Sequence, residues 1–207
     1  MTLLQGREYT ILNMKLQEVE LRALLTPAQK RSMQAFLENK EFRFVKKEKV
    51  RDAYFCATTV KNFSGVEMNE VGSFSLRVRE SLINKKKVVE LNTKVITRFG
   101  DHNAWDEHEV VVSGYEEMVA ILVAIGFKQF FSLQKVRNVY KKSSLSVFFE
   151  DIKDFGACVE IEMMTTASKS DAAKEKIKGL LFELGVAEKQ IVKKSVTNLL
   201  MRNRSKF

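Results

Sequence analysis

Apolar and polar residues alternate with a period of two along most of this chain, as they do in β-strands that bury one face. The alternation predicts strands over residues 15–25, 42–50, 52–60, 74–80, 87–96, 104–112, 128–141, 145–152 and 157–164. The chain is therefore expected to be built mainly from β-sheet.

Helical spacing interrupts the strands at three places. Thr26 followed by Pro27 is typical of a helix start, which predicts a helix over residues 28–39. Ser113 is predicted to cap a second helix, which ends at Gly126.

The C-terminal part, residues 169–201, also has helical spacing, with a break at Gly185. A few helices beside many strands predict the α+β fold class. Residues 14–207 are expected to form one domain, and residues 1–13 an N-terminal extension without a recognisable motif.

The composition is that of an ordinary soluble protein, with 45% hydrophobic and 29% charged residues among 207. No segment reaches the ~18 uninterrupted apolar residues of a membrane span, and the first residues lack a secretory pattern. Cys56 and Cys158 have no metal-site spacing, so neither zinc nor a disulfide is indicated. We expect a cytoplasmic protein without a membrane partner, either a monomer or a homodimer.

Acids and bases gather on one face of six predicted strands. These charged sets are Glu18, Glu20 and Arg22; Arg77 and Arg79; Glu90 and Lys94; Glu107 and Glu109; Lys135 and Arg137; and Glu160 and Glu162. The residues between them are largely apolar and would pack beneath the helices, so the charged faces would look the other way. That direction is the lumen if the sheet closes into a barrel, and the solvent if the strands are simply solvated on this face.

Charges in a lumen are costly unless they pair or hold a charged ligand. Carboxylates bind hard cations such as Mg²⁺ or Mn²⁺, whereas arginine and lysine neutralise phosphate oxygens. A lumen lined with both signs therefore suits a complex of a divalent metal with a polyphosphate. The alternation alone does not decide between this interpretation and the solvated one.

The same strands resemble, in order, the motifs of the CYTH superfamily, the triphosphate tunnel metalloenzymes. The matching segments are EVELR at 18–22, DAYF at 52–55, LRVR at 76–79, LNTK at 91–94, the pair Glu107 and Glu109, KVR at 135–137 and VEIE at 159–162. The resemblance covers residues 14–200 and is greatest to the class IV adenylyl cyclase and thiamine triphosphatase branch. It implies a closed eight-stranded antiparallel β-barrel with flanking helices.

Carried over position by position, the resemblance implies metal ligands and triphosphate contacts. The implied ligands of Mg²⁺ or Mn²⁺ are Glu18, Glu20, Glu107, Glu109, Glu160 and Glu162. The implied triphosphate contacts are Arg22, Arg77, Arg79, Lys94, Lys135 and Arg137. The candidates for catalytic roles are Lys94, Arg22 and Glu150, with Lys94 positioning or deprotonating a water.

Three positions depart from the family pattern. Arg22 replaces a lysine, and because arginine stays protonated it can bind phosphate but cannot accept a proton. Trp105 stands where an arginine commonly precedes the glutamate pair, and its ring could stack on a nucleobase or pack against a helix. Glu150 occupies the place of an aspartate.

The resemblance favours a class IV adenylyl cyclase-like conversion of ATP to cyclic AMP and pyrophosphate. A thiamine triphosphatase or inorganic triphosphatase is the alternative, and a non-catalytic module that binds nucleotides or RNA ends is a second one. The expected partner is a small-molecule triphosphate, namely ATP, thiamine triphosphate or tripolyphosphate. Nucleic acid is not favoured.

The tunnel does not explain the chain's positive charge of +9. The six basic and seven acidic residues assigned to it, with Glu150 counted among the acids, nearly cancel, so the excess lies elsewhere. Lysines 85–87 and 141–142 are interpreted as solvated strand ends. His102 and His108 are interpreted as surface residues.

Overall fold

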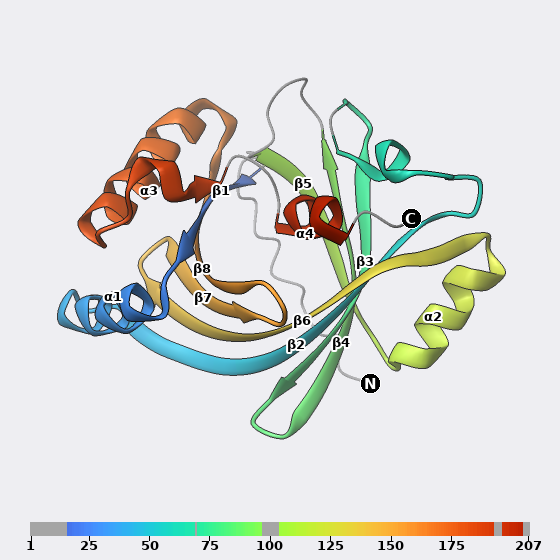
Figure 1. Cartoon of the computed structure of the whole chain (residues 1–207), viewed down its shortest axis with the longest axis horizontal. Coiled ribbons are helices and arrows are strands. Elements are labelled where there is room, and N and C mark those ends of the chain that lie inside the picture. Colours follow the sequence, from blue (N-terminus) through green and yellow to red (C-terminus); the bar gives the residue numbers. More distant parts are fainter. Residues whose placement is uncertain (1–15, 69, 97–103, 193–195, 205–207) are drawn as a thin grey trace, which may run out of the picture.

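The computed structural model describes residues 16–68, 70–96, 104–192 and 196–204, and within these ranges the alternating segments form a long, strongly curved antiparallel sheet (Figure 1). Its strands are β1 (Leu16–Leu25), β2 (Arg43–Ala57), β3 (Phe74–Ile83), β4 (Lys86–Ile96), β5 (Ala104–Val112), β6 (Phe127–Lys142), β7 (Leu145–Ile152), β8 (Gly156–Thr166) and β9 (Ile191–Val192). The helices are α1 (Pro27–Asn39), α2 (Tyr115–Ala124), α3 (Ser170–Glu183) and α4 (Val196–Arg204).

Eight of these strands close into a ring. The sheet order is β5-β4-β3-β2-β6-β7-β8-β1, and β5 pairs back with β1 at Glu18↔Trp105 and Val19↔Ala104. Because every pairing is antiparallel, the ring matches the predicted eight-stranded barrel and the predicted α+β class. The two-residue strand β9 adds to the edge of β1 beyond the point where β5 leaves it.

The helices cover the outside of the barrel at two places and leave the inside to polar side chains. Under α1 and α3, the outward residues of β1, β7 and β8 form the largest apolar cluster, with Phe149, Val159 and Ile161 fully buried. Under α2, the outward residues of β2, β3 and β4 form a second one around Phe55 and Val78. Since successive strand residues point to opposite faces, their polar neighbours must point into the barrel.

The observed start of α1 is the predicted one. Thr26 accepts a hydrogen bond from the backbone N–H of Gln29, and the Gln29 side chain returns to the backbone of Thr26. Pro27 follows as the first helical residue, where its missing N–H costs nothing.

Two expectations about the elements were wrong, and one short strand was not foreseen. The predicted strands 42–50 and 52–60 are one strand, β2, because Arg51 continues the ladder with β3 and β6 and only bulges interrupt it. The cap of α2 is Gly114, without a side-chain hydrogen bond, and Ser113 lies one residue too early. The short strand β9 was not predicted, since two residues carry no alternation.

The hairpin between β3 and β4 turns at Asn84 and Lys85, which both adopt positive φ angles of 49° and 67°. Paired positive φ angles match the twist of the flanking strands, and asparagine tolerates this region well. Among the described helices, none combines the length and apolar character needed to cross a bilayer. The interpretation of residues 1–13 concerns positions outside the described ranges.

Candidate active site

The barrel encloses a cavity of about 1390 Å³ that is lined by the charged faces of the strands. All of the sequence-predicted site residues line it: Glu18, Glu20, Arg22, Arg77, Arg79, Lys94, Glu107, Glu109, Lys135, Arg137, Glu150, Glu160 and Glu162. The charged faces therefore look into the barrel, as the lumen interpretation requires, and the solvated alternative does not hold.

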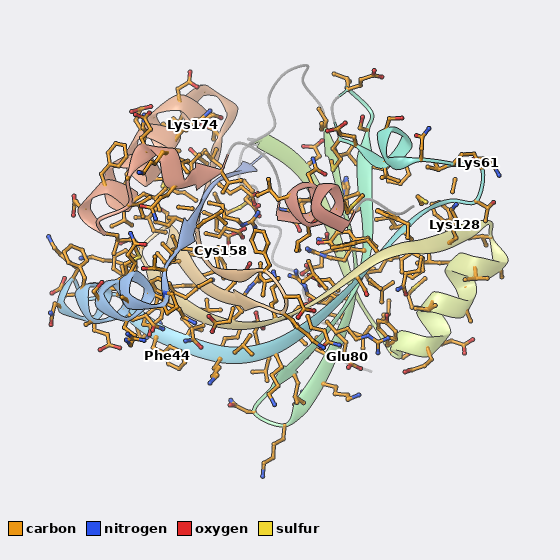
Figure 2. The ribbon with its side chains drawn as sticks, viewed as in Figure 1. Phe44, Lys61, Glu80, Lys128, Cys158 and Lys174 are labelled. Carbon is orange, nitrogen blue, oxygen red and sulfur yellow. The ribbon has the colours of Figure 1, made fainter. Side chains whose placement is uncertain are left out.

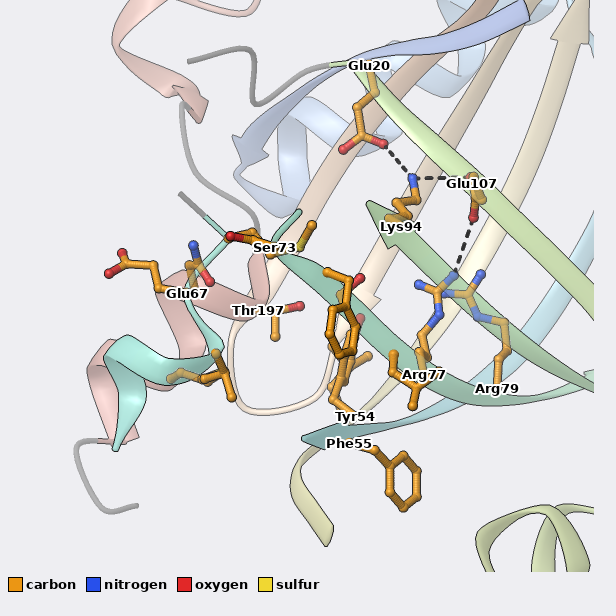
Figure 3. A pocket seen from close by; sticks show the side chains of 18 of the residues that line it. Glu20, Tyr54, Phe55, Glu67, Ser73, Arg77, Arg79, Lys94, Glu107 and Thr197 are labelled. Carbon is orange, nitrogen blue, oxygen red and sulfur yellow. Dashed lines mark hydrogen bonds and ion pairs between the residues drawn. The ribbon is translucent and has the colours of Figure 1, made fainter. Parts of the chain in front are cut away.

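Lys94 lies at the centre of the acidic part of this wall (Figure 3). Its Nζ is 2.6 Å from Oε1 of Glu18, 3.3 Å from Oε2 of Glu20 and 3.4 Å from Oε2 of Glu107. These carboxylates come from β1 and β5, which pair where the ring closes, while Lys94 comes from β4. Closure of the barrel thus assembles three carboxylates around one cation.

Several carboxyl groups share the single cation Lys94, and this crowding shifts their pKa values in opposite directions. Burial, together with the nearby charges of Glu20 and Glu162, raises the pKa of Glu18 to about 9 although Lys94 opposes the shift. Burial alone would raise the pKa of Glu20, but Lys94 and Arg22 outweigh it and lower the pKa to about 2. Burial and the proximity of Glu20 also raise the pKa of Glu162 despite Lys94. This corner of the tunnel therefore has room for additional positive charge.

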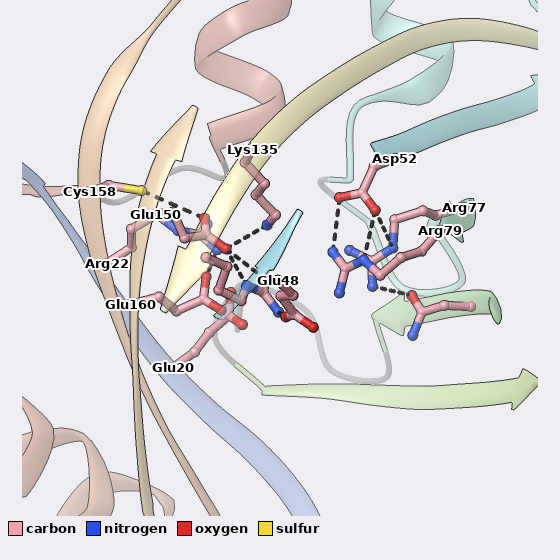
Figure 4. Close-up of polar contacts among 12 residues, drawn as sticks. Glu20, Arg22, Glu48, Asp52, Arg77, Arg79, Lys135, Glu150, Cys158 and Glu160 are labelled. Atoms are coloured by element: carbon pink, nitrogen blue, oxygen red, sulfur yellow. Dashed lines mark hydrogen bonds and ion pairs between the residues drawn. The ribbon is translucent and has the colours of Figure 1, made fainter. Parts of the chain in front are cut away.

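Two arginines of β3 form a basic wall beside Asp52 of β2 (Figure 4). Arg79 holds Asp52 through two parallel bonds, Nε to Oδ1 at 2.7 Å and Nη2 to Oδ2 at 2.9 Å. Arg77 donates to Oδ1 of Asn92 at 3.0 Å. Burial of Asp52 opposes ionisation, but Arg79 and Arg77 hold the pKa of this carboxyl well below its usual range. The fork of Arg79 is therefore fixed by a carboxylate that stays charged at neutral pH.

A second basic group surrounds Glu150 on β6 and β7, and this carboxylate is 1% exposed. Its Oε1 accepts bonds from Nζ of Lys135 at 2.5 Å and from Nε of Arg137 at 2.7 Å. The thiol of Cys158 lies 3.7 Å from its other oxygen. Burial and the positive charge of Arg137 lower the pKa of Lys135 to about 7, although Glu150 opposes the shift. Burial raises the pKa of the Cys158 thiol to about 12, consistent with an unreactive residue.

Arg22 joins the two sides of the tunnel. It forms an ion pair with Glu160 on the neighbouring strand β8, and it lies in the field of Glu20 and Glu150. The Nε atoms of Arg22 and Arg77 are buried and find no hydrogen-bond partner within the described ranges. Unpaired buried donors are costly, and an anionic ligand in the tunnel would satisfy them.

The residues around Lys94 fit a divalent cation. Three glutamate oxygens already converge on one positively charged atom, and oxygen ligands of this kind suit Mg²⁺ or Mn²⁺. Within the described part of the chain, however, no group of three or more histidine, cysteine, aspartate or glutamate side chains is already arranged to hold a metal ion. The glutamates contact Lys94 instead, so a cation would have to compete with it.

The remaining candidate residues lie at the edge of the cavity, on the surface or outside the described positions. Glu109 lines the cavity but is exposed. His108 is exposed, which agrees with a surface role, whereas His102 and the side chain of Trp105 are outside the described positions. Asp52 and Asn92 were missed as site residues, although alternation from Tyr54 and Lys94 places both on the lumen face. Asn92 is neutral, and Asp52 has no charged residue two positions away on β2, so neither belonged to the charged pairs from which the site was predicted.

One end of the cavity is mostly uncharged. Its lining comes from the segment around the 3-10 helix η1 (Phe63–Val66) and from α4. It includes Val66, Met68, Thr197, Asn198 and Met201, together with the two carboxylates of Glu67 and Glu70. Leu200 of α4 packs inside the barrel against an apolar cluster that contains Tyr54 and Phe131. Figure 1 shows α4 between the two halves of the sheet rather than on its outside. No sequence motif had placed α4 at the cavity.

An eight-stranded tunnel with opposed acidic and basic walls defines the class of protein. The chain matches the CYTH domain over residues 16–196, and it belongs to the CYTH domain family. It is 24% identical over 188 residues to a Methanocaldococcus jannaschii protein named "Putative adenylate cyclase MJ0240", a match that covers 88% of this chain and 97% of that protein.

Two solved structures are similar to this fold. The PH1819 protein of Pyrococcus horikoshii superimposes with a TM-score of 0.76 at 24% identity, covering 90% of this chain and 99% of that one. The Hippeastrum protein HpAC1, described as a putative adenylyl cyclase with a dominant triphosphatase activity, superimposes with a TM-score of 0.59 at 17% identity. That match covers 93% of this chain and 97% of HpAC1.

Proposed function

We propose that this chain is a metal-dependent enzyme that binds a nucleoside triphosphate in its tunnel and converts ATP to cyclic AMP and pyrophosphate. The observation that carries the proposal is the pairing of a carboxylate cluster around Lys94 with the buried cations of β3 and β6 across one cavity. Membership in the CYTH family and the name of the M. jannaschii relative support the same reaction.

In this reaction the ribose 3′-oxygen forms a bond to the α-phosphorus. The bond from that phosphorus to the bridging oxygen breaks, pyrophosphate leaves with the electron pair, and the hydroxyl proton goes to solvent or to a basic group. Arg77, Arg79, Lys135 and Arg137 would hold the phosphate oxygens. Mg²⁺ or Mn²⁺ held by the glutamates around Lys94 would neutralise further phosphate charge.

We expect Lys94 to orient the nucleophile or a phosphate rather than to accept a proton. Burial would lower its pKa, but Glu20, Glu18 and Glu107 outweigh it and raise the pKa above the ordinary lysine value. The side chain is therefore an ammonium ion at neutral pH, which suits it to orient a phosphate or a nucleophile.

The mostly uncharged end of the cavity favours a substrate that has an organic group attached to its phosphates. A nucleoside attached to the triphosphate needs a less polar neighbour than its phosphates do, and Val66, Met68 and Met201 supply one beside the hydrogen-bonding groups of Thr197 and Asn198. We therefore favour ATP over tripolyphosphate as the substrate.

The alternative is a triphosphatase, in which water attacks the terminal phosphorus of thiamine triphosphate or tripolyphosphate. The same cations and carboxylates would serve it, and the dominant triphosphatase activity ascribed to HpAC1 supports it. A non-catalytic module that binds nucleotides or RNA ends would retain binding without turnover.

Product analysis tests the proposal. The protein is incubated with ATP, GTP, thiamine triphosphate or tripolyphosphate in the presence of Mg²⁺ or Mn²⁺, and the products are identified by chromatography. Cyclic AMP together with pyrophosphate supports the cyclase. Orthophosphate as the main product would establish the triphosphatase instead, and binding without any turnover would leave the non-catalytic module.

The Glu160→Ala variant is expected to lose metal-dependent turnover by about 100-fold or more while keeping its fold, because Arg22 retains Glu20 and Glu150 as charged neighbours. The measurement is the turnover rate at several Mn²⁺ concentrations together with the melting temperature. The control is Glu80→Ala, which removes a glutamate that contacts Lys87 on the outer face. Unchanged turnover in Glu160→Ala would remove this residue from the site.

As the pH rises from 6 to 8, triphosphate binding by the wild type is expected to weaken relative to that of the Lys135→Arg variant. The pKa of Lys135 is lowered to about 7, so in the free protein this cation loses its charge across that range. The neighbouring carboxyls Glu150 and Asp52 have pKa values held well below this range, and Arg79 has a raised pKa, so their charges stay constant across it. The test compares the Kd for tripolyphosphate of the wild type with that of Lys135→Arg, whose side chain stays charged. A ratio of the two Kd values that is independent of pH would contradict the prediction.

A further inference from the structure

The outer face of β2 is uncovered along the middle of the strand. At one end Phe42 packs into the apolar cluster beneath α1, and at the other end the guanidinium of Arg51 lies 4.3 Å from the ring centre of Tyr115, the first residue of α2. Lys47 and Lys49 point outward between these ends, and both are exposed. Neither helix covers them.

This stretch carries its positive charge on two exposed lysines, whereas Arg51 beside them lies opposite Glu80 on β3. In the described part of the chain, neither Lys47 nor Lys49 forms an ion pair. Their partners across β6 are the neutral residues Asn138 and Val136, and Lys49 lies opposite Leu82 on β3. The next residue in that row, Lys87 on β4, is basic again and contacts Glu80. Because the charges in the tunnel nearly cancel, this face carries part of the chain's excess positive charge that the tunnel does not explain.

The three cations have the spacing of a linear binding surface. Lys47, Lys49 and Arg51 are alternate residues of one strand, so their Cα atoms follow one another at about 6.6 Å along a line. Beyond the bulge at the other end lies Phe44, which is 49% exposed and is held edge-on against Tyr140 at 5.4 Å. Figure 2 shows Phe44 on the outside of the barrel, on the α1 side. A fixed, half-exposed ring beside a row of cations offers a stacking surface for a base.

Acidic residues at both ends of the row distinguish between anionic partners. Glu38 and Glu41 are exposed at the end of α1, and Glu116 and Glu117 are exposed in the first turn of α2. A flat anionic membrane would have to approach these four carboxylates as well as the lysines. A narrow chain can follow the lysines alone.

We propose that the outer face of β2, formed by Phe44, Lys47, Lys49 and Arg51, is a binding surface for single-stranded nucleic acid, separate from the triphosphate tunnel. Phosphates lie along the three cations, and a base stacks on Phe44. Contacts to phosphate carry no sequence information, so the surface binds without strong sequence preference.

The test is fluorescence anisotropy with labelled 12-mers of oligo(U) and oligo(dT) that carry 5′-hydroxyl ends. Tripolyphosphate is present throughout to occupy the tunnel. Three phosphate contacts predict a slope of about −2 for log K against log salt, and Lys47→Gln/Lys49→Gln should reduce it to about −0.7 and weaken binding to both oligomers. Turnover of triphosphates by this variant should be unchanged, since neither lysine lines the cavity.

The matched control is Lys169→Gln/Lys176→Gln, which removes two exposed lysines, one immediately before α3 and one within it. It should leave affinity and salt slope as in the wild type, whereas Phe44→Leu should weaken binding without changing the slope. Equal effects of the two double variants, or none from Lys47→Gln/Lys49→Gln, would overturn the proposal. The proposal would also be overturned, in favour of a membrane partner, if no oligomer bound and the protein instead sedimented with phosphatidylserine vesicles in a way that required Lys47 and Lys49.

Discussion

The Lys94→Met variant is expected to be less stable than the wild type by about 3 kcal/mol at pH 8 and to recover most of that loss when Mn²⁺ is added. The substitution leaves Glu18, Glu20 and Glu107 facing one another without the cation on which they converge. A divalent cation with oxygen ligands can replace the missing charge. The measurement is the melting temperature of both proteins with and without Mn²⁺.

The stability lost in Lys94→Met should depend on pH, in a direction set by the pKa shifts of Lys94 and its carboxylate partners. Because Lys94 has a raised pKa, its stabilising effect is fully present below pH 10.5 in the wild type and is lost only at higher pH. In the variant, the carboxylates of Glu20 and Glu107 lose the cation that lowers their pKa values and protonate more readily, so the destabilisation should shrink as the pH falls from 8 to 5. Lys87→Met, which removes an exposed lysine from the same strand, is the control. A variant that Mn²⁺ stabilises no more than the wild type would argue against a metal site here.

The Glu150→Gln variant is expected to be destabilised by about 3–5 kcal/mol, a drop in melting temperature on the order of 10 °C. The change leaves Lys135 and Arg137 buried without their shared carboxylate. Tripolyphosphate should raise the melting temperature of this variant more than that of the wild type, because the anion supplies the missing negative charge. The measurement is a thermal melt with increasing tripolyphosphate.

Acid should narrow the difference between Glu150→Gln and the wild type. Burial opposes ionisation of Glu150, but Lys135 and Arg137 hold its pKa well below the usual range, so its contribution is present above pH 4.5 and is lost only as the pH falls through the lowered value. Asp151→Asn, at the adjacent exposed position, removes only the contact with Lys30 and should melt like the wild type. If tripolyphosphate stabilises both variants and the wild type equally, the anion does not bind beside Lys135.

The strands and the inward direction of their charges could be predicted because alternation is a local signal. Glu18 and Glu20 on β1 or Arg77 and Arg79 on β3 reveal a charged face within five residues of sequence. Closure of the ring depends on two residue pairs between β1 and β5, distant in sequence, so alternation left it undecided and only the ordered motifs implied it.

The partners inside the tunnel could not be predicted, because they depend on which strands become neighbours. Nothing in the sequence indicates that Lys94 contacts Glu18, which lies 76 residues away, or that Glu150 is shared by two cations. Asp52 was overlooked because its neighbours on β2 are not charged in pairs, although its carboxylate fixes Arg79. The position of α4 inside the barrel depends on tertiary packing of Leu200, which helical spacing alone does not reveal.

The central claim is that the tunnel binds a triphosphate together with a divalent cation. A crystal structure of the protein with Mn²⁺ and tripolyphosphate tests it most directly, since manganese is located by its anomalous signal. The account predicts a manganese peak among Glu18, Glu20 and Glu107, and phosphate oxygens against Arg77, Arg79 and Lys135. Manganese or phosphate bound only outside the barrel, with Lys94 still paired to its three glutamates, would contradict it.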